Sequence, residues 1–291
     1  MGQSNLSLIN QARRHYHSAL LKSIYTLNSD GIASNADKGN KLSIRISKQI
    51  IESLASEVFE NKERSIAQTS GTAFEQLNEQ FLLETLVLLE PFRPGKWHIK
   101  RLGNRNKTDI SDFEQYAHLA DLERLSSANA ELAAALGNDY MVCPDIIVFR
   151  EPLSDEELNE NNQLVDKVSS LKTMLRKANG GKMILHASVS SKWTIRSDRS
   201  QNTRTEALNL IRNRKGHLPH IVAITAEPLP SRLASLTLGT GDIDCVYHSF
   251  LYELVDAVSA SGEEDAAEML KIMIEGKRLK DISDLPLDLM V

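Results

Sequence analysis

Asp145 and Lys192 are the residues whose types and spacing point most directly to chemistry. Asp145 follows Pro144 and precedes the apolar run Ile146–Phe149, and Lys192 comes after 46 intervening residues, two positions beyond Ser190. Because strand side chains alternate between the two faces of a sheet, Ser190 and Lys192 point the same way. An acid at the mouth of a sheet, beside a serine and a lysine from another strand, favours a metal site. Mg²⁺ suits such a site, because it takes oxygen ligands and keeps several waters, so that one or two carboxylates suffice.

A charged cluster follows the lysine. Arg196, Asp198 and Arg199 lie at the predicted end of the same strand, and Glu206 lies on an early turn of a helix predicted to begin after Ser200. The segment 191–215 contains seven basic and two acidic residues in a chain whose net charge is −5. This uneven charge suits a focused cleft, whereas a solvated helix face is the simpler alternative.

Alternating strands and helices must position these residues. Apolar runs predict strands at 97–102, 146–149, 186–195, 221–225 and 244–247. Helical spacing predicts helices within 1–30, 44–59, 69–90, 111–136 (closed by Gly137), 250–259 and 263–274. The polar segment 151–181 is predicted to be a surface excursion of helices and loops. The pattern indicates an α/β fold, with a mixed central sheet flanked by helices. A single domain over residues 1–291 is expected, because no linker interrupts the chain.

The composition is that of an ordinary globular protein, with 41% hydrophobic and 25% charged residues. No apolar run reaches membrane-spanning length and no signal peptide opens the chain, so no membrane partner is expected. Cys143 and Cys245 are too few for a disulfide framework or a cysteine zinc cluster, and they suit a reducing cytoplasm. A pI of about 5.9 argues against indiscriminate nucleic-acid binding.

With Glu206 placed after 13 residues that follow Lys192, the Pro-Asp…Lys pattern resembles the PD-(D/E)XK nuclease superfamily. It is most similar to the NgoMIV-like, CCGG-cutting, tetrameric branch of type II restriction endonucleases, in which the second carboxylate lies on the following helix. Here Ser190 stands at the usual strand position and Glu206 at the helix position. The similarity extends to the distant segments Ser34–Asp37, Gln68–Gly71, Ala73–Glu75, Gln115–Leu119 and Gly276–Asp281. The core pattern alone is a weak signal, and these segments make it specific.

The resemblance implies a restriction-endonuclease fold and Mg²⁺-dependent hydrolysis of DNA. The implied metal ligands are Asp145, Glu206, Glu75 and the main-chain carbonyl of Ser191. Lys192 would orient the attacking water, and Ser190 would hydrogen-bond within the same site. Ser191 replaces a cysteine of the family, but only its backbone is implicated. For Glu75 the alternative is an acid stabilised near a helix N-terminus by the helix dipole.

Base recognition is the second implied activity. Arginine can bond guanine O6 and N7, and aspartate accepts from cytosine N4. The cluster Arg196, Asp198 and Arg199 therefore suits G·C pairs, and in the resembling family it reads the CCGG core. The matching positions imply that Asp37 and Arg232 read an outer G·C pair and that Gln68 contacts the minor groove. The expected site is GCCGGC, cut after the first G. The alternatives are a surface ion-pair cluster for the Arg/Asp/Arg group and an exposed turn acid for Asp37.

The implied partner is double-stranded DNA. A palindromic site requires a two-fold dimer, and the family implies a homotetramer, a dimer of dimers that binds two sites. A cognate methyltransferase would share the bacterial host without being a physical partner. Three alternatives stay open: an endonuclease of this fold with another CCGG-containing site, a non-cleaving sequence-specific DNA-binding relative, and a repair nuclease without sequence specificity. Asp145, Lys192, Glu206 and Glu75 argue against the second, and the Arg/Asp/Arg cluster argues against the third.

Overall fold

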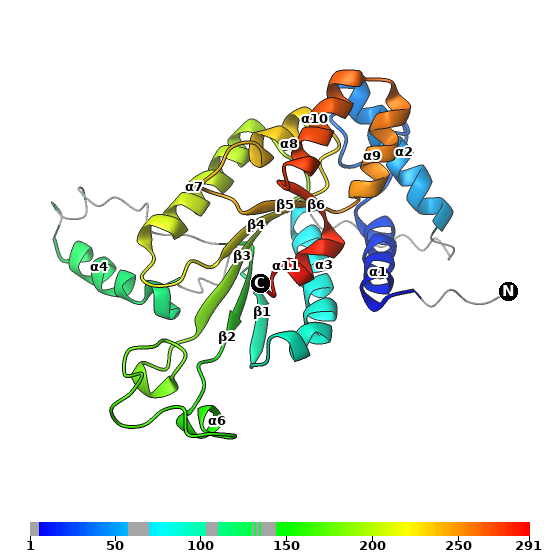
Figure 1. Cartoon of the computed structure of the whole chain (residues 1–291). Helices are drawn as coiled ribbons and strands as arrows, with labels where there is room; N and C mark the ends of the chain where they lie inside the picture. The colour runs from blue at the N-terminus through cyan, green and yellow to red at the C-terminus, as the bar shows by residue number, and fades with distance from the viewer. Residues whose placement is uncertain (1–5, 58–69, 103–109, 130, 132–133, 135–143) are drawn as a thin grey trace.

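A six-stranded mixed sheet forms the centre of the protein (Figure 1). The computed structural model describes residues 6–57, 70–102, 110–129, 131, 134 and 144–291, without the side chains of residues 56–57, 70 and 197–199. The strands follow one another in the sheet in sequence order: β1 (Trp97–Arg101), β2 (Ile146–Arg150), β3 (Ile184–Lys192), β4 (His220–Thr225), β5 (Cys245–His248) and β6 (Leu279–Asp281). The pairs from β1 to β3 are antiparallel and those from β3 to β6 are parallel. The expected α/β fold with a mixed sheet is confirmed.

The junction between β2 and β3 explains how residues far apart in sequence meet. These strands are antiparallel, with Ile146 opposite Val189, so the beginning of β2 lies beside the end of β3. Asp145 directly precedes β2, and Lys192 is the last residue of β3. Seven of the nine residues of β3 are buried, as expected for a strand covered on both faces.

Helices cover both faces of the sheet. The described α-helices are α1 (Leu8–Ser23), α2 (Lys41–Glu57), α3 (Ser70–Leu86), α4 (His118–Ser127), α6 (Asp155–Leu158), α7 (Ser197–Asn213), α8 (Pro230–Thr237), α9 (Leu251–Ser261), α10 (Glu264–Glu275) and α11 (Leu285–Asp288). In Figure 1, α3 lies on one side of the sheet, where it contacts β1 and β3, and α7 lies on the other. None of the described helices combines the length and the apolar character needed to cross a membrane.

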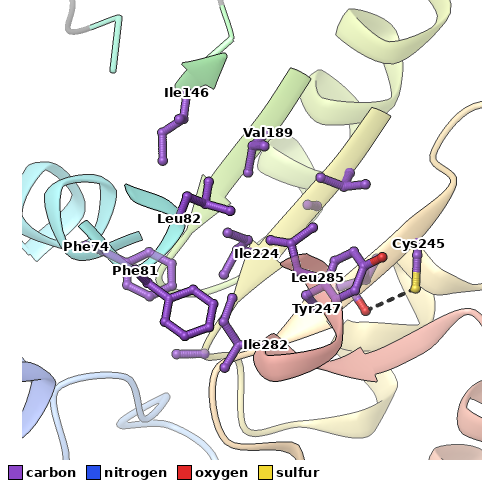
Figure 2. Close-up of a cluster of buried hydrophobic side chains, with 14 of the residues drawn as sticks. Phe74, Phe81, Leu82, Ile146, Val189, Ile224, Cys245, Tyr247, Ile282 and Leu285 are labelled. Carbon is purple, nitrogen blue, oxygen red and sulfur yellow. Dashed lines mark hydrogen bonds between the residues drawn. The ribbon is translucent and has the colours of Figure 1, made fainter. Parts of the chain in front are cut away.

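The core lies between the sheet and α3. Figure 2 shows Phe74, Phe81 and Leu82 of α3 facing Val189 and Ile224 from neighbouring strands. All five are fully or almost fully buried. Because an aromatic side chain buries a large apolar area, this packing fixes α3 firmly against β3.

A buried polar network joins the N-terminal helix to the C-terminal part of the chain. Arg13 of α1 donates bidentately to Asp281, at distances of 2.8 and 2.9 Å, and to Glu253, at 3.0 and 2.8 Å. His17 of α1 lies 2.7 Å from the carbonyl oxygen of Ser249. Both carboxylates are buried, so pairing offsets the cost of removing their charges from water.

The structure corrects the predicted bounds around the lysine. The strand expected at 186–195 is β3, which begins at Ile184 and ends at Lys192. Ile195 donates its N–H to Glu227 and not to a sheet ladder. Helix α7 begins at Ser197 and not after Ser200, so Asp198 and Arg199 lie in its first turn.

Other differences are local. Strand β6 was not predicted, since only Leu279 of its three residues is apolar. The helical prediction for 111–136 is confirmed for α4, but 3₁₀ turns occupy Ile110–Asp112 and Glu114–Tyr116. Gly137 lies outside the described residues. The excursion 151–181 holds α6 and a 3₁₀ turn (Lys177–Asn179), and it extends away from the helical layers in Figure 1. The expectation of a single domain stays a prediction.

Candidate active site

An ion pair between Asp145 and Lys192 forms the centre of the site. Lys192 Nζ lies 2.8 Å from Asp145 Oδ2, and the backbone N–H of Ser191 donates to the same oxygen at 2.7 Å. The side chains of Lys192 and Asp145 expose 22% and 21% of their surface, so a ligand can reach both. The sequence prediction that Asp145 and Lys192 meet at a sheet end is therefore supported by the geometry.

Ser190 and Ser191 lie beside the pair on β3, and both are buried. Asn78 of α3 donates its amide to Ser191 Oγ at 3.1 Å and accepts from the Tyr16 hydroxyl at 2.6 Å. The Tyr16 oxygen also lies 3.0 Å from Ser249 Oγ. This hydrogen-bond chain connects β3 to α3 and α1, and it fixes the position of Ser191.

Two further carboxylates belong to the same electrostatic environment. The pKa of Glu206, on α7, is raised by burial and by the charge of Asp145, whereas Lys192 lowers it. The pKa of Glu75, on α3, is raised mainly by burial and then by Asp145, whereas Arg101 and Lys192 lower it. Because Asp145 disfavours the ionised form of both glutamates, it lies close enough to each of them to repel it.

The donors are suited to a hard cation that keeps part of its water shell. In the described part of the chain, no three His, Cys, Asp or Glu side chains are arranged as a complete metal cage. Mg²⁺ does not need one, because one or two carboxylates and several waters satisfy it. The repulsion between Asp145 and each of the two glutamates would be offset by such a cation. The residues present therefore fit Mg²⁺.

Arg101, which the sequence argument did not single out, adjoins Glu75. Its Nη1 lies 3.6 Å from Glu75 Oε2, and its Nε lies 3.8 Å from Glu79 Oε2. The backbone N–H of Arg101 also donates to Glu79 Oε1 at 2.8 Å. Arg101 thus partly neutralises Glu75 from the end of β1.

A polar cleft of about 750 Å³ contains Asp37, Arg196 and Arg232. Asp37 forms an ion pair with Arg232 and accepts from the Gly39 N–H at 3.0 Å. The bond from Gly39 is the main cause of the lowered pKa of Asp37, and the charges of Arg232 and Arg196 lower it further. About one third of each partner in the ion pair is exposed. The cleft therefore presents both an acceptor and a fork of donors to a ligand.

The structure describes the side chains of three of the six predicted DNA-reading residues. Arg196 is the exposed N-cap residue of α7. Asp198 and Arg199 follow it on the backbone, but their side chains are not described. Gln68 lies outside the described residues. Asp37 and Arg232, predicted from the resemblance to act together, form a direct pair.

Asn78 and Glu227 are the other functional candidates that sequence reasoning missed. Asn78 lies one turn beyond Glu75 on the same helix, so its spacing was a usable signal. Glu227 lies two positions beyond the end of β4 and is fully buried. A carboxylate this close to a buried strand requires partners, and that rule could have marked it.

One family of known proteins matches most of this chain. A family described as NgoMIV restriction enzyme matches residues 16–291. The type II restriction enzyme NgoMIV of Neisseria gonorrhoeae is 52% identical over 285 residues, which cover 98% of this chain and 99% of that protein.

Two solved structures are also similar. The restriction endonuclease PspGI in complex with substrate DNA is 10% identical with a TM-score of 0.30, and the match covers 98% of this chain and 93% of that one. The type IIF restriction endonuclease Bse634I with cognate DNA is 14% identical with a TM-score of 0.39, and the match covers 90% and 92%.

Proposed function

This chain belongs to the NgoMIV restriction enzyme family and is a type II site-specific deoxyribonuclease, and we propose that it cuts double-stranded DNA at GCCGGC. Membership confirms the resemblance inferred from the Pro-Asp…Lys pattern. The proposed cut follows the first G and leaves 5′ CCGG overhangs. Location in the cytoplasm, expected from the cysteine usage, and a bacterial host, implied by the resemblance, stay predictions.

One observation carries the proposal: the Asp145–Lys192 pair and the Asp37–Arg232 pair are mounted on connected elements. Lys192 ends β3, and the three residues after it lead to Arg196, which lines the same cleft as Asp37 and Arg232. A cutting centre and a base-reading cleft are therefore separated by one short segment of chain. This arrangement supports cleavage at a defined distance from the bases that are read.

In the proposed mechanism, the chain's own residues orient the attacking water and stabilise charge. Lys192 donates a hydrogen bond from Nζ, now directed at Asp145, and its positive charge would stabilise the negative charge that develops on the phosphate. The N–H of Ser191 holds Asp145 in place, so the carboxylate keeps its orientation during the reaction. Glu206 would assist in orienting the water, because a carboxylate accepts hydrogen bonds from it.

Mg²⁺ is the proposed cofactor. Asp145, Glu206 and the carbonyl of Ser191 would hold it, with Glu75 behind them, and Ser190 would hydrogen-bond within the same site. When bound, Mg²⁺ lowers the pKa of the attacking water and shields charge on the phosphate. Arg101 would keep Glu75 ionised and oriented towards this site through their 3.6 Å ion pair.

Two groups of residues are proposed to read the bases. Arg196, Asp198 and Arg199 would read the CCGG core, since their donors and acceptor match guanine and cytosine in the major groove. Asp37 and Arg232 would read the outer pair, with the arginine on guanine and the aspartate on cytosine. Their exposed ion pair already presents both groups to the cleft. Gln68 is proposed as a minor-groove contact on the resemblance alone.

The proposed assembly is a homotetramer that binds two DNA sites. A palindrome calls for a two-fold dimer, and the excursion 151–181 offers a surface for pairing dimers. Leu164 and Val168, within it, expose 67% and 83% of their surface. Single exposed apolar side chains are common on protein surfaces, so the tetramer is proposed from the family resemblance, with this loop and the C-terminal helices as candidate contacts. Sedimentation equilibrium should then give about four times the 32.5 kDa chain mass.

The decisive test is digestion of plasmid DNA with Mg²⁺, followed by sequencing of the ends. The expected result is a cut in each strand of GCCGGC after the first G, with no cut when Mg²⁺ is removed by a chelator. A matched plasmid that carries CCGG with other outer pairs serves as the control. Cutting at every CCGG would show that Asp37 and Arg232 do not read the outer pair. Cutting only at another CCGG-containing site would leave the enzyme class unchanged and replace the proposed sequence.

A further inference from the structure

Glu227 lies at the meeting point of the segments that carry the proposed DNA-reading residues. It follows β4 by two positions, and its side chain is fully buried. A buried carboxylate is costly unless it is hydrogen-bonded. Burial raises its pKa to about 7, although hydrogen bonds from Ile195 and Leu229 and the charge of Arg232 act in the opposite sense. The partners of this carboxylate therefore indicate its role in the structure.

The two carboxylate oxygens bind two different segments. Oε2 accepts from the N–H of Ile195 at 2.8 Å, and Oε1 accepts from the N–H of Leu229 at 3.2 Å. Ile195 directly precedes Arg196, and Leu229 is the N-cap residue of α8, the helix that carries Arg232. The Glu227 side chain thus fixes the backbone beside Arg196, the proposed reader of the core. It also fixes the start of the helix that carries Arg232, a proposed reader of the outer pair.

The segment that carries Asp37, the third proposed DNA-reading residue, is bound to the residue before Glu227. Asn35, two residues before Asp37, donates its amide to the carbonyl oxygen of Ala226 at 2.7 Å. Arg232 Nη1 lies 3.9 Å from Glu227 Oε2, while Nη2 of the same guanidinium binds Asp37. The guanidinium is therefore shared between a buried carboxylate and an exposed one. Only the exposed one is free to exchange this contact for a base.

The main chain of Glu227 is itself well fixed. His248 lies at the end of β5, and its Nδ1 accepts from the N–H of Phe250 at 3.1 Å. Its Nε2 therefore carries the proton, which it donates to the carbonyl oxygen of Glu227 at 3.0 Å. The N–H of Glu227 donates to Thr225 Oγ1 at 3.2 Å. With both its main-chain groups bound, Glu227 is a rigid support.

From this geometry we infer that Glu227 is a positioning residue for sequence discrimination: it sets the placement of Arg196 relative to Arg232, so that the core and outer base pairs are read together. The inference rests on the recognition roles proposed above. Glu227 touches no base and takes no part in hydrolysis. Its loss is expected to weaken discrimination at core and outer positions simultaneously, whereas loss of Arg232 alone would weaken discrimination at the outer position.

The test compares Glu227→Gln with the wild type and with Glu253→Gln. Glutamine keeps the size of Glu227, but its NH₂ group cannot accept from Ile195 or Leu229, so one of the two hydrogen bonds is lost. Glu253 is also a buried carboxylate, and it pairs with Arg13 away from the cleft. It therefore serves as the control for a general loss of stability.

Binding is measured in Ca²⁺ at a temperature well below the unfolding midpoint of each variant. The duplexes carry the wild type's preferred site, the same site with the outer pair exchanged, the same site with one core pair exchanged, and a random sequence. For Glu227→Gln, the preference for the intact site over both altered sites should fall by about tenfold, the value of one good base contact. Affinity for the random duplex should stay close to that of the wild type, and Glu253→Gln should keep the wild-type preferences.

Several results would overturn the inference. Unchanged preferences in folded Glu227→Gln would show that the carboxylate serves stability alone. An equal loss in Glu253→Gln would show that any loosening of the fold relaxes recognition. Should Glu227→Gln fail to fold, Glu227→Asp takes its place: it keeps the charge but is one methylene too short to span both N–H groups, and unchanged preferences would again refute the inference. Because the preferred site of the wild type is measured first, failure of the GCCGGC assignment is distinguished from failure of the role of Glu227.

Discussion

The burial of the Glu227 carboxylate predicts an unusual pH dependence of the protein's stability. Its pKa is about 7 in the folded protein, against an ordinary value of 4.5, mainly because its carboxylate is buried. The folded state therefore binds the proton more tightly than the unfolded state does. Stability from this group is fully present below pH 4.5 and is lost as pH rises through 7. The difference between 4.5 and 7, at about 1.4 kcal/mol per unit of pH, corresponds to about 3 kcal/mol in the free energy of unfolding.

The perturbation that isolates this effect is Glu227→Gln, because glutamine does not titrate. Urea-induced unfolding of both proteins is measured between pH 5 and pH 8 at one fixed protein concentration, since assembly also affects apparent stability. The variant has one buried hydrogen bond fewer, so its absolute stability differs at every pH. The expected signal is the change in that difference: the wild type loses about 2–3 kcal/mol relative to the variant as the pH rises from 5 to 8.

Other buried groups do not produce the same signal. Burial lowers the pKa of His17 and of His248 to about 4, so each of them destabilises the folded state as the pH falls below 6.5. Both histidines are present in both proteins, and their contributions cancel in the comparison. Parallel curves of stability against pH for the wild type and Glu227→Gln would refute the reasoning, because they would mean that the carboxylate keeps an ordinary pKa despite its burial.

The other predictions concern cleavage, recognition, support of the site and assembly. Lys192→Ala should abolish cleavage and leave specific binding in a Ca²⁺ gel shift nearly intact; joint loss of both in a folded variant would make Lys192 a DNA contact. Asp198→Ala should lower specific binding by about 1–3 kcal/mol with little change on random duplexes, and equal weakening on both would indicate a role in folding. Asn78→Ala should lower the free energy of unfolding by about 2–3 kcal/mol, because buried hydrogen bonds to Tyr16 and Ser191 are lost. It should also slow cleavage. Thermal unfolding measures the first effect and initial rates the second, and an unchanged rate would show that the hydrogen-bond chain does not support the site. A plasmid with two sites should be cut faster than one with a single site, and equal rates with a dimeric sedimentation mass would exclude the tetramer.

The strands that carry the Asp145–Lys192 pair could be predicted because their residues are almost all apolar or small. Ile146–Phe149 and the run around Val189 indicated β2 and β3, and the position of Pro144 placed Asp145 at a strand start. The sequence pattern did not show which strands pair with one another in the sheet. Strand β6 exists because it pairs with β5, from Val246 to His248, and three residues with one apolar side chain carry too little periodicity to reveal that contact.

The candidate site was predictable where chemistry and spacing coincide, and not where a residue acts through the backbone of another. Asp145 and Lys192 combine unlike charges at strand ends, which sequence can suggest. Glu227 and Asn78 are informative only through what they bind: N–H groups of Ile195 and Leu229 in one case, and Ser191 Oγ in the other. Such partners are set by tertiary packing, so they become visible only in three dimensions.

The network between α1, α9 and β6 joins segments that are synthesised far apart in time. Arg13 is synthesised early, its partners Glu253 and Asp281 come much later, and the contact with Asp281 spans 268 residues. Contacts of such long range form late in folding. Tyr16, on the same helix, supports Ser191 through Asn78, so the site is not fully supported until α1 docks. A nascent chain that has not yet reached residue 281 is therefore expected to lack the full support that α1 gives to Ser191.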